Sequence, residues 1–387
     1  MKRIRCGIIG LGMMGKEFAS SVMRWAHLPE MEVYPEVVAI CSGSLKEADR
    51  KWYSRALPTI TQMTTDYRAL ISNPEVEMVY AAVPHHLHEE IYTACFKAGK
   101  HLMGEKPFGI DLNANRSIMD GYKQHDHLLV RCATQIIFIP AVQRLGAMIE
   151  AGFFGTVFDV DAGFLHSSDL NPDKPINWKR TIASNGAYGC MGDLGMHVLH
   201  LPLRSGWRPL NVRAVLSNIM TERPDAQGNR VPCETWDNAV LLCEAEDRKG
   251  TRFPMSLRMQ RISPGEKNSW YITVKGTKGA AHFTTKQINT LNYLDYRNNP
   301  DQAWSVLDMG HETSFKSVTG GIFEVGASDI ILQMWGSYFY ELHHHKPQST
   351  YTQCATPEEA VMSHHLFTAA LESHETRQTI PITFDRA

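Results

Sequence analysis

The hydrophobic pattern at the start of the chain changes once, at a glycine-rich turn. From Lys2 to Ile9, apolar positions alternate with polar or small ones, which predicts a short buried strand. From Lys16 to Ala26, apolar residues recur at helical spacing, which predicts an amphipathic helix. The turn that joins them is Gly10-Leu11-Gly12-Met13-Met14-Gly15, so the pattern G-x-G-x-x-G lies between a strand and a helix.

This context gives the glycine pattern a chemical meaning. The first glycine permits a tight turn, the second lets a pyrophosphate approach the backbone, and the third lets the helix pack closely on the strand. Phosphate charge is then stabilised at the N-terminus of the helix. The sequence therefore predicts a dinucleotide site whose first contacts are Gly10, Gly12, Met13 and Met14.

Two further strands are predicted to end beside the nucleotide, because ligands bind such sheets at the carboxyl ends of the strands. Val37 to Cys41 is followed by Ser42, where an acidic residue would select the 2′-hydroxyl of NAD. No arginine clamp for a 2′-phosphate stands there either, so NAD and NADP both stay open, with NAD slightly favoured. The strand from Val76 to Val83 ends in a loop whose Pro84, His85 and His88 we expect to contact the cofactor.

Neither cluster of histidines predicts a metal site. His85, His86 and His88 have no carboxylate or cysteine partner nearby in the sequence. The run 343–345 consists of three histidines at the end of a predicted helix, where protonated imidazoles favour the helix dipole. The eight cysteines are scattered, without a C-x-x-C spacing, which favours buried thiols over a zinc site or a disulfide framework.

Composition excludes several classes of partner. The 387 residues carry a formal net charge of −2, so there is no general basic field for nucleic acid or anionic lipid. No apolar run is long enough to cross a bilayer. We expect a cytoplasmic protein without a nucleic-acid or membrane partner.

The second half of the chain is rich in strands without intervening helices, which is typical of one antiparallel sheet. The predicted fold is α/β, with an N-terminal Rossmann domain over 1–133 and a C-terminal α/β domain over 134–387 built on a large, mostly antiparallel open sheet. The segment 240–243 is apolar on both sides, and one strand carries an apolar row of Phe253, Met255, Leu257 and Met259. Since large uncovered apolar faces mark interfaces, we predict a homo-oligomer joined through this sheet.

Several of these motifs together resemble a known family. The glycine turn, the strand that ends at Pro84, the run 98–101 and Glu105-Lys106-Pro107 are similar to the glucose–fructose oxidoreductase, inositol dehydrogenase and rhizopine catabolism family. The resemblance extends over nearly the whole chain and implies hydride transfer between NAD(P) and a secondary alcohol of a sugar, cyclitol or related compound. It also implies that relatives assemble through the second sheet, and that some keep their nucleotide bound during purification.

Lys106 and its neighbour Glu105 are expected at the cofactor. The resemblance implies that the lysine of the E-K-P motif touches both the nicotinamide and the substrate. The residues agree, because a lysine at the carboxyl end of a parallel strand, followed by a proline, points into the ligand crevice. There its ammonium can donate a hydrogen bond to a hydroxyl and stabilise developing negative charge on the oxygen.

A second catalytic group is predicted on the helix that follows the glycine-rich loop 186–192. Asp193 and His197 are four residues apart, so both project from one helical face. An imidazole beside a carboxylate is a good proton acceptor near neutral pH. The resemblance implies the same assignment, with the histidine as the acid/base and the aspartate beside it.

Four residues are candidate substrate contacts: Lys179, Arg180, Tyr188 and His200. The first two are suggested by their place in the family, although a plain surface pair remains an alternative reading. Tyr188 and His200 depart from the family pattern, where a glycine and an aspartate are commoner. The substrate therefore does not follow from the resemblance.

The predicted function is an NAD(P)-dependent sugar or polyol dehydrogenase in which His197 takes the hydroxyl proton, Asp193 orients it and Lys106 polarises the oxygen. Two alternatives remain open at this point. The same residues could serve an NAD-dependent glycosidase that oxidises its sugar transiently. The second alternative is a non-catalytic sensor of a sugar or cofactor. Lys106, Asp193 and His197 together argue against it, because a sensor needs no proton acceptor.

Overall fold

The computed structural model describes residues 1–298, 300–310 and 312–384. Contacts between Cα atoms divide the chain into two compact units. The first contains residues 1–109, 113–139 and 311–357, and the second contains residues 110–112, 140–310 and 358–387. The first unit is therefore made of separate stretches of the sequence. The predicted domains, 1–133 and 134–387, are each one continuous stretch and do not assign the segment after residue 311 to the first unit. This division stays a prediction.

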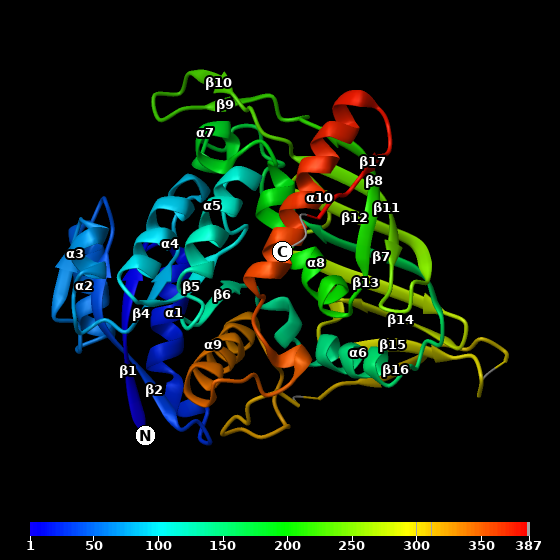
Figure 1. The fold of residues 1–387 in the computed structure, drawn as a ribbon, viewed down its shortest axis with the longest axis horizontal. Helices are drawn as coiled ribbons and strands as arrows, with labels where there is room; N and C mark the ends of the chain where they lie inside the picture. The colour runs from blue at the N-terminus through cyan, green and yellow to red at the C-terminus, as the bar shows by residue number, and fades with distance from the viewer. Residues whose placement is uncertain (299, 311, 385–387) are drawn as a thin grey trace. The chain divides into compact units, whose positions relative to one another are not determined.

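The first unit is built on a six-stranded parallel sheet in the order β3-β2-β1-β4-β5-β6 (Figure 1). This is the order of a dinucleotide-binding Rossmann sheet, with its reversal between β1 and β4. The predicted N-terminal Rossmann sheet is thus confirmed. Its strands are β1 (Lys2–Ile9), β2 (Val33–Cys41), β3 (Gln62–Thr64), β4 (Met78–Ala81), β5 (His101–Glu105) and β6 (Val130–Ala133).

Strand β2 is longer than the sequence pattern indicates. The pattern places its start at Val37, whereas the strand begins at Val33 and includes Pro35, which pairs with Ile4 of β1. Proline is tolerated there because β3 pairs only with Ala39 to Cys41, so the other side of Pro35 faces no strand of this sheet.

Five helices of the described part of the first unit alternate with its strands along the chain. They are α1 (Met13–Met23), α2 (Glu47–Ala56), α3 (Tyr67–Ile71), α4 (His88–Lys97) and α5 (Leu112–Lys123). A sixth, α9 (Ala327–His344), comes from much later in the sequence and packs against α1.

An aromatic cluster fixes α9 to this unit. The ring of Trp335 lies 3.9 Å from that of Phe18 and 4.8 Å from that of Tyr80, measured between centroids, and all three side chains are fully buried. At the edge of the sheet, Arg131 Nε donates a 2.9 Å hydrogen bond to Glu341 of the same helix. Burial of such large rings contributes a few kcal/mol for each side chain, about 1.5–3, so α9 is part of the core of this unit.

The second unit is built on a nine-stranded sheet in the order β16-β15-β14-β13-β7-β12-β11-β8-β17 (Figure 1). All neighbouring strands are antiparallel except β7 and β12, which confirms the predicted large, mostly antiparallel sheet. The strands are β7 (Val157–Leu165), β8 (Arg208–Ser217), β11 (Asn238–Glu246), β12 (Arg252–Gln260), β13 (Ser269–Gly276), β14 (Gly279–Thr284), β15 (Thr290–Asp295), β16 (Ser305–Asp308) and β17 (Ile380–Pro381). A separate hairpin contains β9 (Glu222–Pro224) and β10 (Arg230–Pro232).

Four helices accompany this sheet: α6 (Pro140–Glu150), α7 (Ile182–Asn185), α8 (Cys190–Arg204) and α10 (Pro357–Thr376). Helix α8 is buried along its whole length and packs on β7, β11 and β12, while α6 packs on β14 and β15. Within the described residues, no helix is long and apolar enough to cross a membrane.

The apolar row of β12 has a different role from the one expected. Phe253, Met255, Leu257 and Met259 are buried within the chain, on the strand that α8 covers. The opposite face of β12 is mostly polar and charged, with Pro254 as its apolar member. Exposed apolar residues of the sheet include Val215 on β8 and Leu242 on β11. The exposed apolar surface of this sheet that could form an interface is therefore the smaller patch of Val215 and Leu242. The homo-oligomer stays a prediction.

Candidate functional site

The glycine turn has the geometry that a dinucleotide needs. Gly10 has a φ of +100°, and a Cβ at this position would lie 2.0 Å from the carbonyl oxygen of Ala82, so only glycine fits. Gly12 precedes α1, and nothing lies within 4 Å of the place where its Cβ would be. Among the described residues no side chain caps α1, which leaves its first turn open to a phosphate. The residues at this turn therefore fit a bound dinucleotide.

The end of β2 contributes Ser42, which is half-buried and donates its backbone N–H to Thr64 of β3 at 3.3 Å. Exposed Gly43 and Ser44 follow it, and Lys46 and Arg50 lie at and after the start of α2. No acidic side chain occupies this strand end in the sequence. The structure thus adds no group that would separate NAD from NADP.

The three histidines of the loop after β4 differ in their exposure to solvent. His85 and His88 are both buried, and His86 is exposed. The ring of His88 is bonded to the backbone on both sides: Gly109 N–H donates to Nδ1 at 3.3 Å, and Nε2 lies 3.1 Å from the carbonyl oxygen of Val83. His88 therefore ties this loop to the turn that follows Pro107, and a direct contact of His85, His88 or Pro84 with the cofactor stays a prediction.

Glu105 and Lys106 stand at the end of β5, as the sequence indicates. Two buried tyrosines fix this strand end: Tyr80 donates a 2.7 Å hydrogen bond to the Glu105 carboxylate, and Tyr92 donates a 2.9 Å bond to the Glu105 carbonyl. Burial raises the pKa of Tyr80 well above its usual value, and the Glu105 carboxylate adds to this, so Tyr80 stays a donor. Lys106 directly follows β5 and is half-buried.

In the second unit, α8 carries both Asp193 and His197, which confirms the predicted helix but starts it at Cys190. Gly189, just before the helix, has a φ of +57°, and a Cβ there would lie 2.6 Å from the backbone nitrogen of Trp236. The indole of Trp270 donates a 2.9 Å hydrogen bond to the carbonyl oxygen of His197. The edge of the imidazole packs on the ring of Phe164 with centroids 5.5 Å apart. His197 is thus set by three elements, α8, β7 and β13.

Asp193 is held by two cations. The ammonium of Lys179 donates a 2.7 Å hydrogen bond to one carboxylate oxygen, and the guanidinium of Arg261 binds the other. Arg261 is buried and donates through Nε to Asp169 at 2.8 Å, so one guanidinium joins the two aspartates. Burial alone would raise the pKa of Asp169, but Arg261 outweighs it and, with Lys174 and Arg223, lowers that pKa to about 2.

Arg180, expected to face the substrate, points into the interior instead. It is completely buried and donates to Met220 O at 2.8 Å and Asn218 Oδ1 at 3.0 Å, with Asp237 3.5 Å away. Lys179, its neighbour, is about one-third exposed and reaches Asp193. Lys179 therefore lies beside Asp193 of the predicted acid/base pair, whereas Arg180 binds the loop that contains Asn218 and Met220.

Tyr188 and His200 are also buried. The Tyr188 hydroxyl lies 2.7 Å from the Thr368 hydroxyl, on α10. His200 Nε2 lies 3.0 Å from Arg204, which in turn donates to Glu359 at 2.7 and 2.8 Å. Burial lowers the pKa of His200 to about 3, opposed by Glu359 and assisted by Arg204, so the ring is neutral at physiological pH. These contacts favour packing roles, and a contact of either residue with a substrate stays a prediction.

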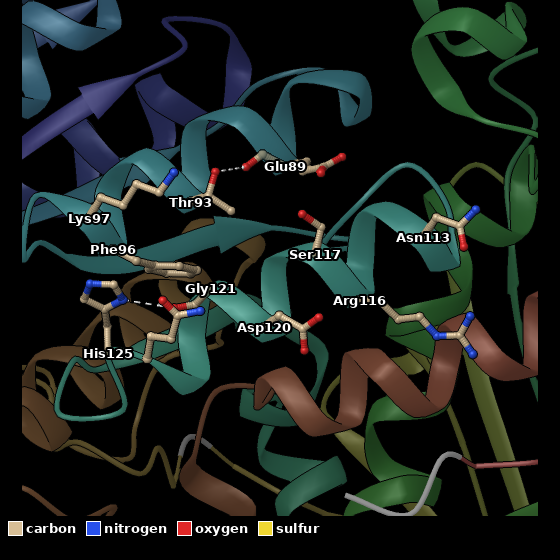
Figure 2. Close-up of a pocket in the computed structure, with 11 residues that line it drawn as sticks. Glu89, Thr93, Phe96, Lys97, Asn113, Arg116, Ser117, Asp120, Gly121 and His125 are labelled. Carbon is tan, nitrogen blue, oxygen red and sulfur yellow. Dashed lines mark hydrogen bonds between the residues drawn. The ribbon is translucent and has the colours of Figure 1, made fainter.

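A hollow of about 660 Å³ lies away from all of these residues, between α4 and α5 (Figure 2). Figure 2 shows that polar and charged side chains line it, with Glu89 and Thr93 on α4 and Arg116, Ser117 and Asp120 on α5. None of the predicted cofactor, catalytic or substrate residues is among its lining residues. We therefore do not assign the predicted dehydrogenase site to this hollow.

Comparison with known proteins decides the family. Residues 4–131 match the model of an oxidoreductase family with an NAD-binding Rossmann fold, and residues 142–282 match the GFO/IDH/MocA C-terminal domain. The chain belongs to the Gfo/Idh/MocA oxidoreductase family. The family resemblance seen in the sequence is thereby confirmed, together with a nicotinamide cofactor and the class of NAD(P)-dependent dehydrogenases.

Relatives of this Gfo/Idh/MocA protein cover most of its length. Levoglucosan dehydrogenase of Pseudarthrobacter phenanthrenivorans is 29% identical over 311 residues, which are 75% of this chain and 76% of the relative. Trans-1,2-dihydrobenzene-1,2-diol dehydrogenase of Sus scrofa is 26% identical over 278 residues, 72% and 73% of the two chains. A solved structure of levoglucosan dehydrogenase in complex with NADH and L-sorbose has a TM-score of 0.87 at 21% identity, covering 99% of this chain and all of that one.

Sequence reasoning missed Arg261, although a signal for it exists. The inward positions of β12 are Phe253, Met255, Leu257 and Met259, and the next position with the same parity is Arg261. A charged residue that continues an apolar row must find a buried partner. That partner could not be named from the sequence, because Asp169 and Asp193 are distant along the chain.

Proposed function

We propose that this protein transfers a hydride between NAD(P) and a secondary alcohol of a sugar, glycoside or cyclitol. His197 acts as the acid/base, Asp193 orients it, and Lys106 polarises the substrate oxygen. Membership of the Gfo/Idh/MocA family supports the reaction class. The name of the levoglucosan dehydrogenase relative supports a sugar-like substrate.

The observation that carries the proposal is the fixed arrangement on α8. Asp193 and His197 lie one helical turn apart on a buried helix, and the carboxylate is bound by Lys179 and Arg261. These two contacts restrict the rotation of the carboxylate. Such a carboxylate can stabilise the positive charge that His197 acquires when it takes a proton.

The first unit supplies the cofactor site. Gly10, Gly12 and the first turn of α1 would hold the pyrophosphate, and the ends of β2 and β4 would flank the adenosine. The nicotinamide, when bound, supplies the hydride acceptor or donor. Lys106 would donate a hydrogen bond to the substrate oxygen and stabilise its negative charge as His197 removes the proton. In the reverse direction His197 returns the proton to the same oxygen.

A cofactor-reduction screen tests this proposal. Purified protein is mixed with NAD or NADP and with free sugars, glycosides or inositols, and absorbance of the reduced cofactor is followed. Mass spectrometry of the protein accompanies the screen, because a retained nucleotide would keep reduced cofactor out of solution. We expect oxidation of at least one compound and loss of this activity in His197→Ala.

Two results would contradict the proposal. Release of an aglycone from a glycoside without net cofactor reduction would indicate a glycosidase. Equal turnover in the His197→Ala variant would remove the histidine from the mechanism, provided that circular dichroism shows both proteins folded.

A further inference from the structure

Three side chains at the end of α9 form a group that the dehydrogenase function does not use. His343 and His344 are the last two residues of this helix, and Glu32 directly precedes β2. In the part of the chain that the structure describes, they bring two imidazole nitrogens and one carboxylate oxygen within 4.8 Å of one another. All three belong to the first compact unit and line a pocket of about 260 Å³.

The distances within this group suit a metal ion. Nε2 of His343 and Nε2 of His344 each lie 3.4 Å from the same oxygen, Oε2 of Glu32. Zinc binds histidine nitrogen and carboxylate oxygen at about 2.0–2.2 Å in tetrahedral geometry, which separates neighbouring ligand atoms by about 3.4 Å. Both distances to the carboxylate oxygen match this spacing, and the two imidazole nitrogens lie within 4.8 Å of each other.

The donor set also restricts the class of ion. Two imidazoles and one carboxylate form a ligand set that zinc uses in proteins, with water in the fourth position. Imidazole suits zinc, nickel and copper, whereas magnesium and calcium prefer oxygen ligands. The eight cysteines are all buried, so thiols of the folded chain do not compete for the ion.

The surroundings hold the ligands in place and attract a cation. The ring of His344 packs on that of Tyr340 with centroids 4.2 Å apart, one turn earlier on the same helix. The C-terminal end of a helix carries partial negative charge, which favours a cation. Glu30 also lines the pocket, but its carboxylate is paired with Lys316 at 2.7 Å. The two histidines are each about 30% exposed, so an ion can enter from solvent.

We propose that Glu32, His343 and His344 bind one divalent transition-metal ion of the zinc class. The ion would join the end of α9 to the start of β2 and stabilise the first unit. The sequence pattern predicted no metal site here because these histidines stand at the C-terminal end of a predicted helix, and Glu32 lies more than 300 residues before them. Only the fold brings the carboxylate to them.

Zinc titration of the untagged protein tests this site. The protein is stripped with a chelator, dialysed, and titrated with ZnCl₂ by isothermal calorimetry, with MgCl₂ as the comparison ion. We expect about one zinc per chain, no magnesium binding, and a thermal midpoint that rises with zinc concentration because the ion binds the folded state. His343→Ala and Glu32→Gln should each weaken zinc binding at least tenfold.

His345 provides the matched control. It follows the other two histidines, is exposed, and has a φ of +56°, which asparagine tolerates. His345→Asn should keep the zinc affinity and the zinc-dependent rise of the midpoint. Absence of zinc binding to the wild-type protein, or equal zinc affinity in the wild type, His343→Ala and Glu32→Gln, would overturn the proposal. Midpoints measured in chelator verify that each variant is folded.

Discussion

The ammonium of Lys179 donates a 2.7 Å hydrogen bond to Oδ1 of Asp193. Lys179 comes from the short turn before α7, and Asp193 lies in the first turn of α8, so the bond fixes the loop between them. Of the two cationic side chains that bind Asp193, Lys179 is the more exposed to solvent, because Arg261 is nearly inaccessible. We therefore predict that a substrate approaching Asp193 meets Lys179 before Arg261.

Replacing Lys179 by methionine should lower kcat by at least about tenfold while the protein stays folded. The reason is the loss of a charge-assisted hydrogen bond that orients Asp193, whereas Arg261 still binds the carboxylate. Steady-state kinetics on the substrate found in the screen measure the effect. Lys174→Met is the matched control, because Lys174 pairs with Asp169 instead. Equal losses in the two variants would contradict the assignment.

Lys106→Ala should slow turnover by two or more powers of ten and leave nucleotide binding intact. This is roughly the effect of losing one charged contact to the transition state. Single-turnover kinetics give the rate, and cofactor fluorescence gives nucleotide affinity. Lys97→Ala, an exposed lysine of α4, serves as the control. Near-normal turnover in Lys106→Ala would remove this lysine from the mechanism.

Discrimination between NAD and NADP should be modest, within about two powers of ten in kcat/KM. Ser42 stands at the end of β2, so neither a repelling carboxylate nor a bidentate clamp selects the 2′ group. Comparing kcat/KM for the two cofactors measures the preference. A preference above about ten-thousandfold would show that another residue selects the cofactor.

Mild acid should destabilise the protein through His200. The unfolded chain protonates this ring below its usual pKa of 6.5, whereas burial keeps the folded ring neutral down to about pH 3. Between these values the unfolded state binds more protons, so stability falls as pH falls, by at most about 1.4 kcal/mol for each pH unit. Thermal midpoints of wild type and His200→Gln between pH 7 and pH 4.5 test this. The variant should lose less over that range, and parallel curves would refute the role of His200.

Light scattering at micromolar concentration should give a mass of at least twice 43.7 kDa. Val215 and Leu242, on neighbouring strands, are 59% and 52% exposed and form an apolar patch on the open face of the sheet. Leu242→Lys places a charge in this patch and should shift the mass toward that of one chain. A clean monomer of the wild-type protein would exclude the predicted assembly.

The sequence predicts most of the sheet architecture because its patterns are local. The glycine turn stands between a periodic strand and a periodic helix, and the later strands alternate without helices between them. Lys106, Asp193 and His197 are predicted from motifs of three to five residues, and their roles stay predictions. Arg180 was predicted to contact the substrate, and its burial depends on Asn218 and Asp237, whose approach no local pattern encodes.

Helix α9 has a consequence for the synthesis of the chain. Trp335 and Phe339 cover Phe18 and Trp25 of the first unit, but they leave the ribosome about two hundred residues after the last strand of the sheet that they complete. The aromatic residues of the nascent nucleotide-binding unit therefore stay uncovered while eight of the nine strands of the second sheet, all but β17, are translated. Transiently exposed surface of this kind promotes aggregation and recruits chaperones. The first unit can therefore complete its core only after the segment 327–344 has been synthesised.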